Sequence, residues 1–428
     1  MRYSISEIRL KYLFEARMSG AWGEEPEEGN SIVCIRAADF ITEKLQHKKI
    51  DLTKRSFKKE EFEKKQLRKG DVILEKSGGG ENQPVGRVVM FDLDEPALCS
   101  NFLELLRPNI RKVESKFVTY VLYSLWINRV NTRAIKQTTG IQNLDITEYL
   151  DTKVSLPSID KQFEILKRLE KEIVHIDNLI GSKEKLLSIL SEKKQTLITQ
   201  AVTKGLNPKI KIRDSKIDWL GYLPQHWQIK RIKHVASKIG SGVTPKGGAE
   251  VYQQEGIPLV RSQNVHFDGL RLDDIVHIDF ETHESMSNSK VEIGDVLLNI
   301  TGASIGRCYY YEGQYEEANV NQHVCIIRPN DKILTKYLYY FLMSDFGQMQ
   351  ISMCQVGGGR EGLTFESIKA FIIPLPEINE QQALLDSLET SIGHLNNLAK
   401  STKRSIELLT ERKLALITES VTGQLKID

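Results

Sequence analysis

The longest regular pattern along the chain consists of two apolar stripes, each flanked by lysine and glutamate. In residues 156–205, leucine, isoleucine and valine recur every three or four positions from Ile165 to Val202. The same pattern returns in residues 375–428, from Leu384 onwards. A period of about 3.5–3.6 residues is typical of a long amphipathic helix. A helix of about 45 residues spans roughly 65 Å.

Outside these stretches the pattern changes to short β-branched, apolar and aromatic runs, which glycine, asparagine and aspartate interrupt. Ser31–Ile35, Asp295–Ile300 and Val324–Ile327 are examples. Such runs predict the strands of compact, partly barrel-like domains. Apolar residues at three- and four-residue spacing also predict short helices at 116–130 and 336–343.

The chain repeats itself. Leu156–Gln162 matches Leu375–Gln381 at a shift of 219 residues. The same shift carries Glu192–Thr199 onto Glu411–Thr418 without a gap. Upstream the similarity continues once small insertions are allowed. A duplication of this kind predicts two similar halves, each a β-rich domain followed by a long helix.

Together the patterns predict an α+β fold. Neither stripe can be buried on a small β-domain alone, so we expect the two long helices to pack on each other as an antiparallel coiled coil. The two β-rich domains are then separated by the helices and related by a pseudo-twofold axis. The alternative is a coiled coil with a second copy of the chain. The predicted segments are a first β-rich domain at 1–155, a first long helix at 156–205, a basic linker at 206–230, a second β-rich domain at 231–374, and a second long helix with a C-terminal tail at 375–428.

The charges of the chain nearly cancel. There are 59 Lys and Arg against 57 Asp and Glu, with a formal net charge of +2, so any surface that attracts nucleic acid must be local. From Lys44 to Lys69 there are eleven basic residues against four acidic ones, and from Lys204 to Lys233 eight against two. Each run is either a solvated face or a basic surface for nucleic acid.

Cysteine usage and hydropathy indicate the cellular compartment of the protein. The five cysteines form no C-x-x-C pair and stand beside no histidine cluster, so neither a zinc site nor a disulfide framework is predicted. No run of about 18 apolar residues occurs, and Met1–Ile5 does not start a signal peptide. We therefore expect a cytoplasmic protein that makes no membrane contact.

Signatures of catalysis are missing from the sequence. It has no N-P-P-Y/F loop, the motif that holds a flipped adenine for methylation, and no G-x-x-x-x-G-K-[ST] phosphate loop. Asp71, Glu75 and Lys76 resemble a metal-dependent nuclease motif only loosely, and the repeat replaces Glu75 and Lys76 with Asn299 and Ile300. A turn that opens a strand explains Asp71 better. We expect no catalytic residue and no metal site.

Glycine-rich segments and polar side chains in the two β-rich domains suggest contacts with double-stranded DNA. Arginine, lysine and hydroxyl groups bind phosphates, whereas Asn, Gln, Arg and His carry the donors and acceptors that read base edges. A plain surface role is the alternative for each residue. The candidates are Arg36, Lys76, Asn82, Gln83, Arg87, Gln142 and Asn143 in the first half, and Thr244, Lys246, Arg261, Gln263, Asn264, Thr301, Ser304, Arg307, Gln322, His323 and Arg360 in the second.

Four motifs resemble a known family. Trp219–Trp227 and Gly240–Pro245 resemble the entry to the second target-recognition domain of specificity subunits in Type I restriction-modification systems. Arg360–Ile368, which leads to Ile373–Gln382, resembles the exit from that domain. With the duplication, the resemblance covers essentially the whole chain. The first half departs from it at Thr139–Leu144, where the Arg-Glu pair is replaced, and it lacks the tryptophan-containing lead-in.

The resemblance implies a non-catalytic DNA-recognition subunit. Each target-recognition domain would read one half of a bipartite, asymmetric site, and the helices would dock two modification (methyltransferase) subunits and, for restriction, translocase/endonuclease subunits. This chain would hold no cofactor, because S-adenosylmethionine, ATP and Mg²⁺ would bind the partner subunits. The alternative is a stand-alone or decoy coiled-coil scaffold without autonomous DNA modification.

Overall fold

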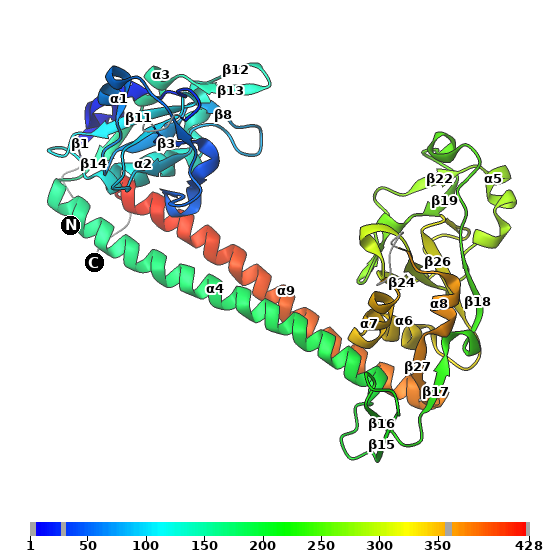
Figure 1. Cartoon of the computed structure of the whole chain (residues 1–428). Helices are drawn as coiled ribbons and strands as arrows, with labels where there is room; N and C mark the ends of the chain where they lie inside the picture. Colours follow the sequence, from blue (N-terminus) through cyan, green and yellow to red (C-terminus); the bar gives the residue numbers. More distant parts are fainter. Residues whose placement is uncertain (1–5, 27–30, 356–361, 425–428) are drawn as a thin grey trace. The chain divides into compact units, whose positions relative to one another are not determined.

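The computed structural model describes residues 6–26, 31–355 and 362–424 of the chain. The chain divides into two compact units. The first comprises Met1–Glu184 together with Arg404–Asp428, and the second comprises Lys185–Lys403. Each unit therefore contains one β-rich domain and one part of each long helix (Figure 1).

The β-rich domain of the first unit is built on a four-stranded antiparallel sheet. In spatial order its strands are β2 (Phe14–Ser19), β11 (Leu103–Pro108), β7 (Val72–Glu75) and β9 (Val88–Met90). A second sheet has the order β10 (Ala97–Cys99), β3 (Ile32–Ile35) and β6 (Lys54–Arg55), and β10 runs parallel to β3. Smaller sheets are β12 (Ile135–Thr139), β13 (Ile141–Leu144) and β8 (Ser77–Gly78); β4 (Phe40–Ile41) and β5 (Gln46–His47); and β1 (Ser6–Arg9) with β14 (Lys153–Leu156). The short helices are α1 (Lys59–Lys65), α2 (Ser115–Ile127) and α3 (Ile146–Leu150), with a 3-10 turn, η2, at Ala37–Asp39.

The β-rich domain of the second unit repeats this plan. Its main sheet has the order β18 (Ala236–Ser241), β26 (Val324–Pro329), β23 (Val296–Asn299) and β24 (Cys308–Tyr310). The second sheet has the order β22 (Val276–Ile278), β19 (Ile257–Val260) and β25 (Asn319–Val320), and β19 runs parallel to β25. The smaller sheets are β17 (Gln228–Arg231) with β27 (Ile372–Leu375), β20 (Val265–His266) with β21 (Gly269–Leu270), and β15 (Ile212–Asp214) with β16 (Tyr222–Pro224). The short helices are α5 (Phe280–Ser285), α6 (Thr335–Met343), α7 (Asp345–Met353) and α8 (Phe365–Ala370), with a 3-10 turn, η7, at Ser262–Asn264.

Strand β7 shows why the central strands read as continuous apolar runs. Successive side chains of a strand point to opposite faces. Val72 and Leu74 accordingly pack against α2, whereas Ile73 packs into a separate cluster with residues of β3. All three are fully buried because both faces of the sheet are covered. In β23, Val296, Leu297 and Leu298 divide between two clusters in the same way.

The matching strand orders confirm the predicted internal repeat and the α+β fold, and α2 and α6 confirm the two predicted short helices. The halves differ after these helices. The first unit continues into the β12–β13 hairpin, which contains the Thr139–Leu144 stretch that departs from the family pattern. The second unit places α7 after α6.

The two apolar stripes form helices of 45 residues each, α4 (Ile159–Thr203) and α9 (Ile378–Thr422). In the first unit, Leu169 near the start of α4 shares a core with Ile417 near the end of α9. In the second unit, Val202 near the end of α4 shares a core with Leu388 near the start of α9. The helices of one chain therefore pack antiparallel in both units, as predicted. In the described part of the chain, no helix has the length and the low polarity needed to span a membrane.

A buried glutamine fastens each long helix to its own β-rich domain. Gln162 Oε1 accepts a hydrogen bond from the backbone N–H of Glu114 at 2.8 Å, and its Nε2 donates to the carbonyls of Pro157 and Lys112 at 2.9 and 3.2 Å. Gln381 repeats all three bonds in the second unit. The glutamine shared by the repeated segments Leu156–Gln162 and Leu375–Gln381 thus joins a helix to a domain.

We expect Gln162→Leu to lower the free energy of unfolding by about 2–4 kcal/mol, because it leaves one buried N–H and two carbonyls without partners. Denaturant unfolding of the full chain, followed by circular dichroism, measures the effect. Gln382→Leu is the matched control, since Gln382 is exposed and, among the described residues, its side chain bonds only to Asp386 on its own helix. Equal losses in the two variants would contradict the anchoring role of Gln162.

Candidate nucleic-acid interface

Asp71, the residue weighed above as a nuclease carboxylate, forms an ion pair inside the fold. The Arg107 guanidinium donates to both of its oxygens, at 2.9 and 2.7 Å, and the backbone N–H of Arg68 donates at 2.8 Å. Asp295 holds the equivalent pair with Arg328, at 2.7 and 2.9 Å. Each aspartate comes directly before a central strand. These carboxylates therefore stabilise the sheets, which agrees with the strand-opening role predicted for Asp71.

A cavity of about 450 Å³ opens in the first unit where β7 ends and β11 begins. Arg36, which directly precedes the turn η2, lines its wall, and the Asp39 carboxylate accepts two hydrogen bonds from that guanidinium at 3.3 and 3.1 Å. The hydrogen bonds to Asp39 raise the pKa of Arg36. Side chains from four separate segments thus meet at one end of the main sheet, in a cavity lined in part by Trp22, Arg36, Glu75, Ser77 and Phe102.

The second unit gathers polar side chains at the equivalent strand ends. Thr301, just beyond β23, shares a hydrogen bond with Nδ1 of His323, just before β26. The Gln322 amide nitrogen lies 2.9 Å from Nε2 of the same imidazole. Asn299, the last residue of β23, donates to the carbonyl of Ser262 in η7 at 2.7 Å and to Ser304 Oγ at 3.1 Å. Five residues predicted from the sequence to contact DNA thus share one end of the main sheet with η7: Gln263, Thr301, Ser304, Gln322 and His323.

Three predicted residues of the first half are engaged in the fold. Lys76 pairs with Glu104 at 3.2 Å and also bonds to Ser19. Arg87 forms two hydrogen bonds to Glu75, at 2.9 and 2.6 Å, and these bonds raise its pKa. The buried Gln142 accepts a hydrogen bond from the backbone N–H of Val85 at 3.1 Å. We assign structural roles to these side chains.

The second half contains two comparable cases. Asn264 is fully buried and donates to the carbonyl of Arg271 and to Asp274, at 2.8 and 3.0 Å. Arg261 donates to the backbone carbonyl of Asp274 at 2.7 Å, and its guanidinium lies over the Tyr252 ring. Asn264 exposes no surface to a ligand, so its amide orders η7 for its neighbours Ser262 and Gln263.

The remaining predicted residues that the structure describes have polar atoms that face solvent. Asn143 is exposed, and its side-chain oxygen accepts a hydrogen bond from Ser77 at 2.6 Å. Arg307 is half-buried and forms no ion pair with any described residue. Arg360 lies outside the described residues. The other exposed residues of this kind are Asn82, Gln83, Thr244 and Lys246.

Sequence reasoning missed two aromatic residues at the first-unit cavity. Trp22 and Phe102 are 38% and 48% exposed, although large aromatic side chains usually prefer the interior. The Arg55 guanidinium lies 4.3 Å from the centre of the Trp22 ring. The repeat itself contains the signal that would have found them, because Trp22 and Phe102 occupy the positions of the predicted residues Thr244 and His323.

The basic run Lys44–Lys69 borders this region through β6. Some of its charges are neutralised, for example Lys49 by Asp92 at 2.7 Å and Lys65 by Glu61 at 2.9 Å. Others are exposed and form no ion pair with the described residues, which leaves a local excess of positive charge. These are Lys44, Lys48, Lys54, Lys58, Lys64 and Arg68.

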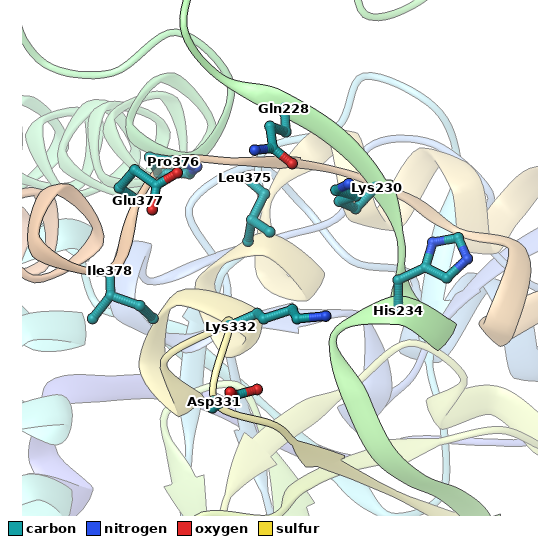
Figure 2. A pocket seen from close by; sticks show the side chains of 9 residues that line it. All are labelled: Gln228, Lys230, His234, Asp331, Lys332, Leu375, Pro376, Glu377 and Ile378. Atoms are coloured by element: carbon teal, nitrogen blue, oxygen red, sulfur yellow. The ribbon is translucent and has the colours of Figure 1, made fainter.

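A second cavity, of about 530 Å³, lies at the other end of β26. Figure 2 shows Gln228 and Lys230 along β17, Asp331 and Lys332 after β26, and Glu377 before α9. Charges of both signs line it, and it lies across the length of β26 from His323. It is therefore separate from the candidate interface.

These features define a class of protein: two copies of one β-rich domain, joined to paired long helices, with side chains gathered at the same sheet end in each copy. The family model for the Type I restriction modification DNA specificity domain matches residues 8–187 and again residues 224–408. The two matches cover most of the chain. The chain belongs to this family of specificity subunits.

Individual relatives agree with this assignment. The putative type I restriction enzyme MjaX specificity subunit of Methanocaldococcus jannaschii is 22% identical over 90% of this chain and 86% of its own length. The MjaVIII specificity subunit of the same organism is 24% identical over 72% of this chain and 70% of its own. The HsdS subunit of Thermoanaerobacter tengcongensis has a similar fold, with a TM-score of 0.55 at 16% identity over 98% of this chain and 97% of that one. A chain from a structural study of type I restriction-modification assembly reaches a TM-score of 0.73 at 16% identity, over 98% of both chains.

Proposed function

We propose that this chain selects the DNA sequence for a Type I restriction-modification complex and performs no catalysis itself. Each β-rich domain acts as a target-recognition domain and reads one half-site through the end of its main sheet. The observation that carries the proposal is that both domains have a candidate interface at the same end of the main sheet, with different side chains at equivalent positions. Trp22 and Phe102 of the first domain correspond to Thr244 and His323 of the second. Two target-recognition domains with different side chains at their interfaces are expected to recognise two different half-sites. The DNA site is then bipartite and asymmetric, with a spacer between the half-sites that neither domain recognises.

The helices α4 and α9 serve as docking surfaces for two modification subunits and, when the complex restricts DNA, for translocase/endonuclease subunits. Support comes from apolar side chains on the helices that stay exposed although the helices pack on each other. Phe163 and Val174 on α4 and Leu408 on α9 are examples. We place S-adenosylmethionine on the modification subunits and ATP with Mg²⁺ on the restriction subunits, in a complex that works in the cytoplasm.

Mapping of methylated sites tests the proposal. The chain is co-expressed with its cognate modification subunit in a host without adenine methylation of its own, and genomic methylation is compared with that of cells that lack the chain. A new bipartite adenine-methylated motif is the expected result. A folded complex without chain-dependent methylation would refute the proposal and favour a decoy scaffold.

Exchange of residues 231–374 for those of a relative is expected to change one half-site only.

Neutralising the exposed lysines near β6 is expected to weaken DNA binding by the assembled complex for all sequences alike. Each lost phosphate contact reduces the slope of log K against log salt by about 0.9. Four substitutions by glutamine therefore reduce the slope by about 2–4, as measured by fluorescence anisotropy between low and moderate salt. The substitutions are Lys48→Gln, Lys54→Gln, Lys58→Gln and Lys64→Gln.

A control with the same change in charge separates local contacts from net charge. Four exposed lysines on α4, far along the sequence from the basic run, are replaced by glutamine in a second variant. Because α4 also belongs to the proposed docking surface, size-exclusion chromatography first verifies that this variant assembles with the modification subunits. The assembled variant is then expected to keep a slope close to that of the unaltered chain. Equal slopes for all three proteins would refute phosphate contacts by the basic run. The control substitutions are Lys167→Gln, Lys171→Gln, Lys185→Gln and Lys193→Gln.

A further inference from the structure

The interface position is apolar in the first domain and polar in the second. Trp22 lies two residues after Gly20, and Thr244 lies two residues after Gly242. Both glycines are needed where they stand, because a Cβ atom would come within 2.1 Å of the Ser100 carbonyl oxygen in one domain and 1.8 Å of the Val320 carbonyl oxygen in the other. The close backbone approach confirms that Trp22 and Thr244 occupy equivalent places.

Two further pairs follow from the matched strands. Phe102 comes directly before β11 and His323 directly before the equivalent strand β26. In the 3-10 turns, Ala38 of η2 corresponds to Gln263 of η7, since each comes two residues after the arginine that precedes its turn. At all three places the first domain has an apolar side chain and the second has a side chain with hydrogen-bonding groups.

The base edges of DNA offer different chemical groups to an apolar surface and to a hydrogen-bonding surface. In the major groove the C5-methyl group of thymine is the apolar feature of the base edges, whereas the other groups there donate or accept hydrogen bonds. The aromatic pair in the first domain suits the methyl group. Thr244, Gln263 and His323 suit the donors and acceptors. Arg36 and Arg55 beside the apolar cavity are paired with Asp39 and Glu25. Positive charge that matches a DNA partner comes from Lys54, which is exposed, forms no ion pair with a described residue and directly precedes the Arg55 that lies on the Trp22 ring.

We propose that the first domain reads at least one thymine of its half-site through the C5-methyl group, which packs against Trp22 and Phe102, whereas the second domain reads its half-site mainly through hydrogen bonds. The inference rests on the proposed function and adds the chemistry of each half-site. The cavity of about 450 Å³ far exceeds a methyl group, so it receives a base edge together with its methyl. The first half-site therefore contains at least one thymine.

Replacing thymine with deoxyuridine tests this, because the exchange removes the methyl group and keeps every hydrogen-bonding group. Duplexes with the mapped site carry deoxyuridine at one thymine at a time, and binding by the complex with modification subunits is measured. Burial of one methyl group predicts about fourfold weaker binding at a contacted thymine. We expect this loss in the first half-site and a change of less than twofold at each thymine of the second.

The variant Phe102→Ala assigns the effect to the cavity. Its carbonyl, which accepts from the backbone N–H groups of Lys76 and Ser77 at 3.0 and 3.2 Å, is kept by the substitution. The variant is expected to bind the thymine duplex more weakly and to distinguish thymine from deoxyuridine by less than twofold. Tyr12→Ala is the matched control, because Tyr12 is an exposed aromatic residue of the same domain outside the cavity, and it is expected to keep the fourfold ratio.

Three results would overturn the inference: no sensitive thymine in the first half-site, equal sensitivity in both half-sites, or a fourfold ratio that persists in Phe102→Ala. In each case the unaltered complex still binds and methylates its site. Failure of the proposed function has a different signature, since no chain-dependent methylated motif would then exist.

Discussion

Asp295→Ala is expected to lower the free energy of unfolding of the chain by about 3–5 kcal/mol, because it leaves the Arg328 guanidinium without its main partner. Asp295 is fully buried and receives two hydrogen bonds from Arg328 and a third from the backbone N–H of Glu292 at 2.7 Å. The pair connects β26 to the start of β23 at the centre of the main sheet. Denaturant unfolding monitored by circular dichroism measures the loss.

Two further variants test this explanation. Glu407→Gln removes a partner of Arg404 from an exposed ion pair on α9 and is expected to leave stability unchanged. The double variant Asp295→Leu with Arg328→Met removes both charges and is expected to recover most of the stability. If the double variant were as unstable as Asp295→Ala, the loss would not come from an unpaired charge.

Trp227→Ala is expected to cost about 3–5 kcal/mol of unfolding free energy, the usual range for truncation of a fully buried tryptophan. The Trp227 side chain is 1% exposed and belongs to the core that contains Val202 of α4 and Leu384 of α9. Its indole N–H donates to Glu380 Oε1 in the first turn of α9 at 3.0 Å. Truncation therefore leaves a large cavity and an unpaired carboxylate oxygen.

Thermal unfolding of the full chain measures this effect. Trp227→Phe is expected to lose less stability than Trp227→Ala, because it keeps most of the apolar volume. Tyr222→Ala provides the control, as Tyr222 is an exposed aromatic residue on the neighbouring strand β16. A loss in Tyr222→Ala as large as in Trp227→Ala would show that the whole 206–230 segment, and not the buried indole, is sensitive.

The strand next to Asp71 shows how far sequence reasoning reached. A turn at Asp71 was predicted to open a strand, and β7 begins at Val72 as expected. What Asp71 does could not be deduced from its neighbours, since its partner Arg107 stands 36 residues away and pairs with it only once β11 lies beside β7. Gln142 is a similar case, because its partner is the backbone of Val85, 57 residues away.

The candidate interface likewise contains residues that the sequence predicted and residues that only the structure revealed. The repeat was visible in the sequence because matching residues recur at a constant shift, and Gln322 and His323 were predicted from the donors and acceptors that their side chains carry. Their counterpart Phe102 was overlooked, because its side chain is apolar and its exposure became evident only in the folded domain. Asn264 is the opposite case. Its polar side chain suggested a contact with DNA, but in the folded domain this side chain is buried and has a structural role.

Periodicity and local similarity lie along the chain, and they were therefore enough to predict the duplication, the two long helices and the strand-rich domains. Which polar side chains remain available to a ligand became evident only in the folded domains. The reason is physical: a donor or acceptor is available only if no partner satisfies it, and in this protein the partners come from strands and turns far away in sequence. The apolar character of one interface and the polar character of the other emerged only when the two folded domains were compared position by position.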